Sequence, residues 1–176
     1  LYFLGKLANK NGLKVVQVGE GADELFFGYD HWLRFVSLYK KIPKISNISF
    51  GNSIESHRAN LIINILSNNN PFPGGAIGFN MSEIKNLANF NITDKSSIIN
   101  YSDSLWDLYR SKDDFSITKW MTYIDLKIRL PELLLMRMDK LSMQSGVEAR
   151  VPFLDHRIVE FVLSLPSELL YSSDRT

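Results

Sequence analysis

The chain has 176 residues, of which 45% are hydrophobic, a formal net charge of +1 and no cysteine. This composition predicts a globular unit with a sizeable core, and the balanced charge argues against nucleic acid or an anionic membrane as the main partner. Without cysteine there is no disulfide, thiolate nucleophile or cysteine-based zinc site. No apolar run approaches the roughly 20 residues of a membrane helix. We therefore expect a soluble, cytoplasmic protein.

Turn residues and apolar spacing divide the first part of the chain into helices and one strand. Gly12 fits the cap at the end of a first helix. The β-branched run 14–18 predicts a short buried strand. Pro43 should end the helical region that follows this strand, because the residue before a proline avoids helical geometry. The expected helices span residues 1–8, 23–41 (as one or two helices) and 54–66.

The stretch 68–75 (Asn-Asn-Asn-Pro-Phe-Pro-Gly-Gly) is the clearest predicted loop, because Asn, Pro and Gly favour turns. It could be a hinge or an insertion. Further on, Pro131 should stand in the first turn of a helix, where its missing N–H costs nothing, and Asp155 should cap the last helix. After the loop, a short helix is expected to begin at Ser82. The further expected helices span residues 97–110, 116–130, 131–144 (with Gly146 as its cap) and 155–165.

An unusual group of acids follows the predicted strand, in the run Val-Gly-Glu-Gly-Ala-Asp-Glu-Leu-Phe at residues 18–26. Gly19 and Gly21 allow positive φ and close approach of the backbone to a ligand. Glu20 should therefore lie at the end of a strand, where ligands bind in open α/β sheets. The alternative interpretation is structural, because acids at the start of a helix are stabilised by its positive dipole end.

A second informative segment covers residues 130–157, where charged residues interrupt an otherwise apolar helix. The run Glu148-Ala149-Arg150 then alternates charged with small residues before a proline. Buried charges need partners, so we predict that Arg150 points inward and forms a buried ion pair with Asp139. We expect this pair to hold the wall of the site rather than to take part in the chemistry.

Together the two segments resemble the synthetase domain of the glutamine-dependent asparagine synthetases. The first is similar to the family signature Ser-Gly-Glu-Gly-Ser/Ala-Asp-Glu, with Val18 in place of the serine. The second is similar to the signatures Met-Asp-Lys/Arg-hydrophobic-Ser-Met and Glu-Ala/Val-Arg-Val-Pro-Phe-Leu-Asp-His. The resemblance is strong over residues 15–29 and 130–165 and weak between them.

This resemblance implies an α/β fold of the adenine nucleotide alpha hydrolase-like type, as in the PP-loop ATP pyrophosphatases. Residues 1–176 would be the C-terminal part of the synthetase domain, mostly helical, with one parallel strand at 14–18 and an exposed edge. The family's pyrophosphate-binding PP-loop, a lysine further downstream and the glutaminase domain are not in this sequence. We therefore expect residues 1–176 by themselves to be inactive.

The resemblance also implies an ATP-dependent ligase. Such an enzyme activates a carboxylate, aspartate in the type members, as an acyl-adenylate, and ammonia from glutamine then gives the amide, asparagine. By resemblance Glu20 is catalytic, Asp23 binds Mg²⁺, and Val18, Gly19 and Gly21 approach ATP. A glutaminase domain is the expected partner, and a homodimer is compatible with the family. The alternatives are amidation of another carboxylate, closure of a β-lactam, or a non-catalytic relative that serves as a binding or assembly module.

Overall fold

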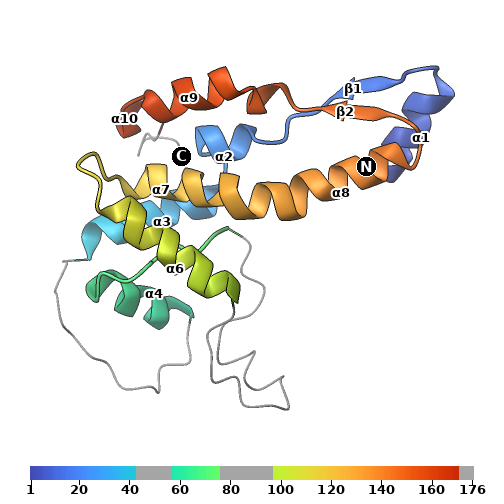
Figure 1. The fold of residues 1–176 in the computed structure, drawn as a ribbon. Coiled ribbons are helices and arrows are strands. Elements are labelled where there is room, and N and C mark those ends of the chain that lie inside the picture. The colour runs from blue at the N-terminus through green and yellow to red at the C-terminus, as the bar shows by residue number, and fades with distance from the viewer. Residues whose placement is uncertain (43–56, 76–96, 171–176) are drawn as a thin grey trace, which may run out of the picture. The chain divides into compact units, whose positions relative to one another are not determined.

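The computed structural model describes residues 1–42, 57–75 and 97–170, which form mostly helices and a small parallel sheet (Figure 1). The chain divides into two compact units, residues 1–33 with 125–176 and residues 34–124. The short helix expected from Ser82 lies outside the described residues. The elements in chain order are α1 (Tyr2–Lys10), β1 (Val15–Gln17), α2 (Ala22–Phe26), α3 (Asp30–Lys41), α4 (His57–Leu66), α6 (Ser97–Arg110), α7 (Ile117–Ile124), the π-helix η1 (Asp125–Leu135), α8 (Met136–Met143), β2 (Glu148–Arg150), the 3₁₀ helix η2 (Pro152–Leu154), α9 (His156–Ser164) and α10 (Ser167–Leu170).

The sheet of the first unit joins two segments from opposite ends of the sequence. Strands β1 and β2 pair in parallel, with Val16 opposite Ala149, and they lie side by side in Figure 1. Helix α8 packs on both α1 and β2. The strand at 14–18 is confirmed, but the prediction that it is buried was wrong, because its residues alternate between exposed and half-buried. Among the described residues this sheet has only two strands, so both have an open edge. The small parallel sheet agrees with an α/β class, and the wider nucleotide-binding fold stays a prediction.

Two glycines end helices as the sequence indicates. Gly12 follows α1 with φ of +76°, and its N–H donates to the carbonyl of Asn9 at 2.9 Å. Gly146 follows α8 with φ of +65°, and its N–H donates to the carbonyl of Met143 at 2.8 Å. These hydrogen bonds use carbonyls that have no partner within a helix. The second of these turns leads the chain directly into β2.

Pro131 does not start a helix, contrary to the prediction. It lies inside the π-helix η1, which is followed directly by α8. Proline lacks the N–H that an α-helix requires and clashes with the preceding turn, and the wider π-turn is one known way for a helix to accommodate such a break. The boundary predicted between helices 116–130 and 131–144 is therefore absent at Pro131, because η1 runs from Asp125 to Leu135 and α8 follows at Met136. The stretch from η1 through α8 carries Asp125 and the first part of the second segment, up to Met143.

Asp155 caps α9 as predicted. Its Oδ1 accepts hydrogen bonds from the backbone N–H of Arg157 at 3.0 Å and from the guanidinium of Arg157 at 2.9 Å. The hydrogen bonds from Arg157, together with its charge, hold the pKa of Asp155 far below its usual range. The ionised carboxylate therefore stabilises the N-terminus of α9.

This cap predicts a pH dependence of stability. Because the pKa of Asp155 is lower in the folded than in the unfolded chain, the cap's contribution is complete above about pH 4 and is lost as the pH falls through the folded-state pKa. The variant Asp155→Asn still caps a helix but cannot titrate. We expect its denaturation midpoint to vary less with pH than that of the wild type below pH about 4. Identical pH profiles in chemical denaturation would contradict this prediction.

The second unit packs its helices around aromatic side chains. Trp106 of α6 and Trp120 of α7 are buried, with ring centroids 5.3 Å apart in an edge-to-face arrangement. Tyr109 lies against Trp120 at 5.5 Å. Burial, followed by the negative charge of Asp114, raises the pKa of Tyr109 to about 12, so this phenol stays protonated at neutral pH. Edge-to-face contacts of this kind add to the energy of burial.

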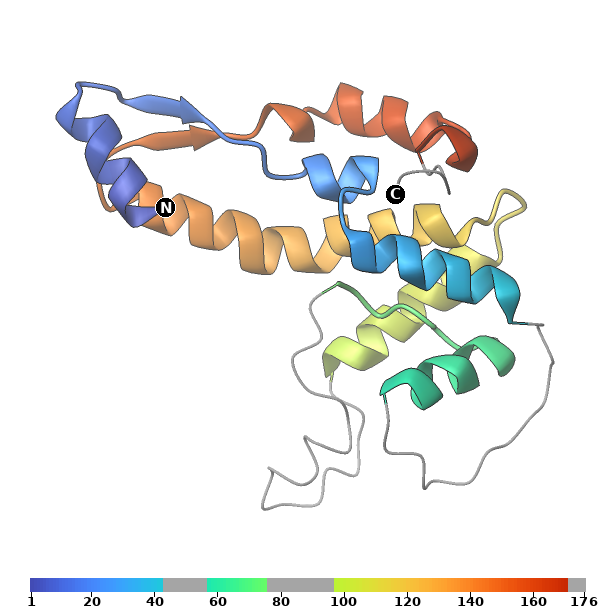
Figure 2. The ribbon, with the colours of Figure 1, turned by 180° about the vertical axis from the view of Figure 1, so that it is seen from behind.

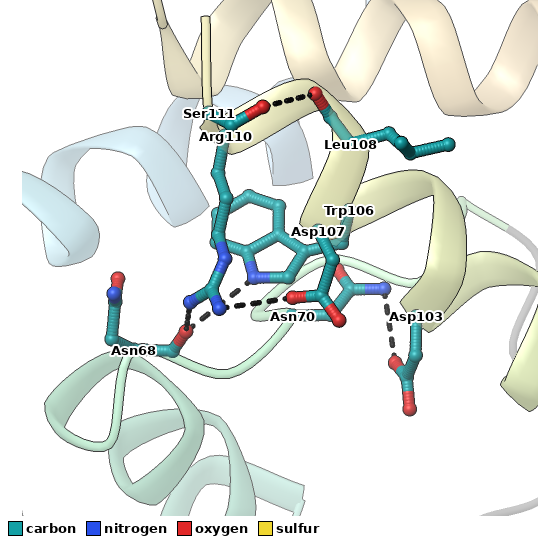
Figure 3. Close-up of polar contacts among 8 residues, drawn as sticks. All are labelled: Asn68, Asn70, Asp103, Trp106, Asp107, Leu108, Arg110 and Ser111. Carbon is teal, nitrogen blue, oxygen red and sulfur yellow. Dashed lines mark hydrogen bonds and ion pairs between the residues drawn. The ribbon is translucent and has the colours of Figure 1, made fainter.

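The loop at residues 68–75 is fastened to α6 rather than free to act as a hinge. Arg110 donates to the carbonyl of Asn68 at 2.8 Å, as Figure 3 shows, and Trp106 Nε1 donates to the same oxygen at 3.4 Å. The Asn70 side chain is buried, donates to Ser102 Oγ at 2.9 Å and accepts from a backbone N–H of the loop. Buried polar groups bonded in this way specify one loop conformation.

Candidate active site

The turn that carries Glu20 begins where β1 ends. Val18 extends the ladder by one hydrogen bond, because its N–H donates to the carbonyl of Arg150 at 2.9 Å. The chain then turns, and the N–H of Ala22 donates to the carbonyl of Gly19 at 3.2 Å. Helix α2 starts at once and lies beside α9 in both views (Figures 1 and 2). The structure thus places Glu20 at the carboxyl end of a parallel strand, as predicted.

Gly21 is the residue that makes this turn possible. It has φ of +91° and is buried, and a β-carbon at this position would overlap the side chain of Leu154 in η2. Both the backbone conformation and the space therefore require glycine. Gly19 differs, since its φ lies outside the left-handed region and a β-carbon there would meet nothing within 4 Å. Within the described residues, Gly19 therefore faces open space rather than a neighbouring side chain.

The acids of the turn have different environments. Glu20 is half-buried and Asp23 is exposed, and neither carboxylate has a hydrogen bond or ion pair with any residue in the described ranges. Asp23 packs against Gly28, where a β-carbon would overlap its Oδ1. Glu24, in contrast, is only 1% exposed. Two of the three acids are thus accessible to a ligand, and the third belongs to the core.

Glu24 is held in the core by a network from the π-helix. The hydroxyl of Tyr29 donates to Glu24 Oε1 at 2.7 Å, and Nη1 of Arg129 lies 3.7 Å from the same oxygen. Nη1 also donates to Asp125 Oδ2 at 2.9 Å, while Nη2 donates to the Tyr29 hydroxyl at 3.2 Å. Glu24 and Asp125 are almost completely buried and Arg129 is 15% exposed. Arg129 thus gives both buried acids a cationic neighbour, and each of these acids has at least one polar partner, as buried charges require.

The network changes the proton affinities of its members. Burial raises the pKa of Tyr29, and the hydrogen bond and charge of Glu24 raise it further, so the phenol remains a donor at any physiological pH. Burial acts to lower the pKa of Arg129, but the hydrogen bond and charge of Asp125 outweigh it and the pKa is raised. The guanidinium is therefore a permanent cation next to Glu24 and Tyr29.

The predicted buried pair between Asp139 and Arg150 was wrong. Arg150 is exposed, and its Nε donates to Oε1 of Glu148, two residues earlier on the same strand, at 2.8 Å. The hydrogen bond and charge of Arg150 lower the pKa of Glu148. Asp139 is exposed on α8. The physical reason is that β2 is an edge strand, where residues two apart share one face and both charges remain in water.

Sequence reasoning missed two residues of the π-helix, Asp125 and Arg129, which form the network around Glu24. One local signal was present, because an acid followed four residues later by an arginine is a favourable pair on a helix. The contacts of Arg129 with Glu24 and Tyr29 could not be found in this way, since Tyr29 and Arg129 are 100 positions apart. The structure therefore adds an internal support to the site that the motifs alone do not indicate.

The described residues contain neither a preformed metal site nor a helix that could span a membrane. Over residues 1–42, 57–75 and 97–170, no three acids or histidines are close enough together to form a ready-made metal site. A single accessible carboxylate such as Asp23 still fits Mg²⁺ bound with a nucleotide, because this ion commonly takes one or two carboxylates plus substrate phosphates. None of the helices in these ranges is long and apolar enough to cross a membrane.

Comparison with known proteins places the chain in a family. The asparagine synthase family matches it over residues 1–176, so the chain belongs to this family. It is 28% identical over 178 residues to asparagine synthetase (glutamine-hydrolyzing) 1 of Bacillus subtilis (strain 168). This alignment covers 96% of the chain and 27% of that relative. A putative asparagine synthetase (glutamine-hydrolyzing) of Mycobacterium bovis is 28% identical over 185 residues, covering 95% of the chain and 26% of the relative.

The chain thus spans about a quarter of the length of these two relatives. A shorter match, 48% identical over 42 residues, links it to asparagine synthetase (glutamine-hydrolyzing) 3 of Bacillus subtilis (strain 168), covering 24% of the chain and 7% of that protein. No solved structure matches the chain. The family assignment therefore rests on sequence similarity.

Proposed function

We propose that the protein containing this chain is an ATP-dependent ligase that activates aspartate as an acyl-adenylate and converts it to asparagine. The observation that carries the proposal is the Gly-Glu-Gly turn, where Gly21 holds Glu20 at the carboxyl end of β1. In α/β sheets this is where ligands bind. Membership of the asparagine synthase family supports the same reaction class. Residues 1–176 would form the C-terminal part of the synthetase domain.

Glu20 is the proposed catalytic residue. The substrate carboxylate attacks the α-phosphorus of ATP and pyrophosphate leaves. Ammonia then attacks the acyl carbon, AMP leaves and the nitrogen loses a proton. A half-buried carboxylate without a described partner could accept that proton. The open space in front of Gly19 leaves room for the nucleotide beside the backbone of Val18 and Gly21.

Asp23 is the residue proposed to hold Mg²⁺. Its exposed carboxylate follows the turn directly and offers the oxygen ligand that this ion prefers. When bound, Mg²⁺ neutralises phosphate charge and orients the polyphosphate. The partners in this proposal are a glutaminase domain that supplies ammonia and a second copy of the chain in a homodimer. A cytoplasmic location likewise stays a prediction.

The experiment is ATP–pyrophosphate exchange by the full-length protein. We expect exchange that depends on aspartate and on Mg²⁺, followed by formation of asparagine when glutamine is added. A panel of other carboxylates tests whether a different acceptor or an internal amine is used. If no carboxylate supports exchange, the protein is a non-catalytic relative and the proposed reaction is wrong.

Gly28 offers a separate test of Asp23. In the variant Gly28→Ala the new methyl group would overlap Asp23 Oδ1, so the carboxylate must move. We expect the Mg²⁺ concentration for half-maximal exchange to rise by about tenfold, the size typical when the supports of a metal ligand are disturbed. The control is Gly12→Ala, at the end of α1, where a β-carbon meets nothing within 4 Å. An unchanged Mg²⁺ requirement in the Gly28 variant would exclude Asp23 as a ligand.

A further inference from the structure

Arg129 links several groups that lie next to the candidate site. Arg129 contacts three groups at once: Nη1 bonds to Asp125 and lies near Glu24, and Nη2 bonds to the hydroxyl of Tyr29. Its guanidinium carbon also lies 4.6 Å from the centre of the Tyr29 ring, in a cation–π arrangement. The planar fork of arginine can serve several acceptors in fixed directions, which the single ammonium of lysine cannot do.

The contacts of Arg129 fall on both sides of the end of α2. Glu24 lies within α2, and Tyr29 follows shortly after its last residue, Phe26. A helix of five residues is far too short to be stable alone, so its direction depends on tertiary contacts. Glu20 and Asp23 sit at the start of this short helix. A change in the direction of α2 therefore moves both carboxylates of the candidate site.

The π-helix explains how Arg129 reaches this position. η1 places Asp125 and Arg129 on the same side of the helix, where their side chains meet at 2.9 Å. Because Asp125 is fully buried, the pair cannot relax into water, and it gives the guanidinium one fixed orientation. π-Helical segments are often found next to functional sites. Here the segment connects the second sequence motif with the turn of the first.

We propose that Arg129 is a positioning residue of the ligase, which sets the direction of Glu20 and Asp23 through Glu24, Tyr29 and α2. This proposal rests on the ligase function proposed above. Arg129 does not touch the substrate in this proposal. Its loss should lower the rate of adenylate formation, because small displacements of reacting groups have large effects on rates.

The test uses single-turnover adenylate formation by the full-length enzyme. Two mild variants leave the formal charges of the network unchanged: Arg129→Lys retains the cation, and Tyr29→Phe removes only the hydroxyl that bonds to both Glu24 and Arg129. We expect the rate constant to fall by about 10- to 100-fold in each variant, with little change in the KM for ATP. The double variant should be no slower than the slower single variant, because both act through one network.

The matched control is Arg34→Lys, the same substitution at an exposed arginine of α3, which should stay within about twofold of the wild type. A merely structural role would lower the amplitude of the turnover, because less enzyme is folded, while the rate constant stayed the same. That result, or multiplicative losses in the double variant, would overturn the proposal. If the wild-type enzyme forms no adenylate with any carboxylate, the proposed function fails and this inference with it; normal rate constants in all variants of an active enzyme overturn the inference alone.

Discussion

Replacing Gly21 with alanine should lower the free energy of unfolding of the full-length protein by about 3 kcal/mol and abolish its activity. Two costs combine at this position. An L-residue is strained at φ of +91°, and the new β-carbon overlaps Leu154. Relief of the overlap must displace the Leu154 side chain or shift the turn, and the turn carries Glu20. Chemical denaturation gives the stability, and ATP–pyrophosphate exchange gives the activity.

Two other glycines separate these costs. Gly12→Ala introduces strain without overlap, because φ is +76° but no atom lies within 4 Å of the new carbon, and it should cost about 1 kcal/mol with normal activity. Gly19→Ala introduces neither and should leave stability unchanged. If a nucleotide approaches Gly19, however, the KM for ATP should rise in that variant. Equal destabilisation by Gly12→Ala and Gly21→Ala would show that the contact with Leu154 has no energetic role.

The variant Glu20→Gln should fold normally and lose about 100- to 10,000-fold in the rate of amide formation. Glutamine keeps the size and hydrogen-bonding oxygen of glutamate but cannot accept the proton of the attacking amine. Because Glu20 has no hydrogen bond or ion pair with the described residues, its neutralisation breaks no described contact. The measurements are thermal unfolding and the steady-state rate of asparagine formation.

Glu160→Gln is the matched control, since this glutamate is exposed on α9. It should have wild-type stability and activity. Retention of ATP–pyrophosphate exchange by Glu20→Gln together with loss of amide formation would assign the residue to the second step. Full activity in both steps would remove Glu20 from the catalytic machinery.

Local signals in the sequence predicted the helices and their ends well. Gly12 and Asp155 act through hydrogen bonds to residues only a few positions away, so their roles depend little on the rest of the fold. The same holds for the Gly-Glu-Gly turn at the end of β1, where the residue types dictate the backbone. Pro131 is the exception. Its local rule predicts a helix start, but the surrounding helical segment continues through it as a π-helix.

The family motifs, the turn at Glu20 and the alternation of charges in β2 can be recognised in the sequence alone. Which charges are buried, and with which partners, follows from the packing of distant segments. Arg150 follows the predicted alternation but faces solvent and pairs with Glu148, whereas Glu24, which looked like one more acid at a helix start, is enclosed by Arg129. The physical reason is the separation in sequence between the interacting groups. A cap or turn depends on its neighbours in sequence, while the compensation of a buried charge depends on distant segments that meet only in the folded chain.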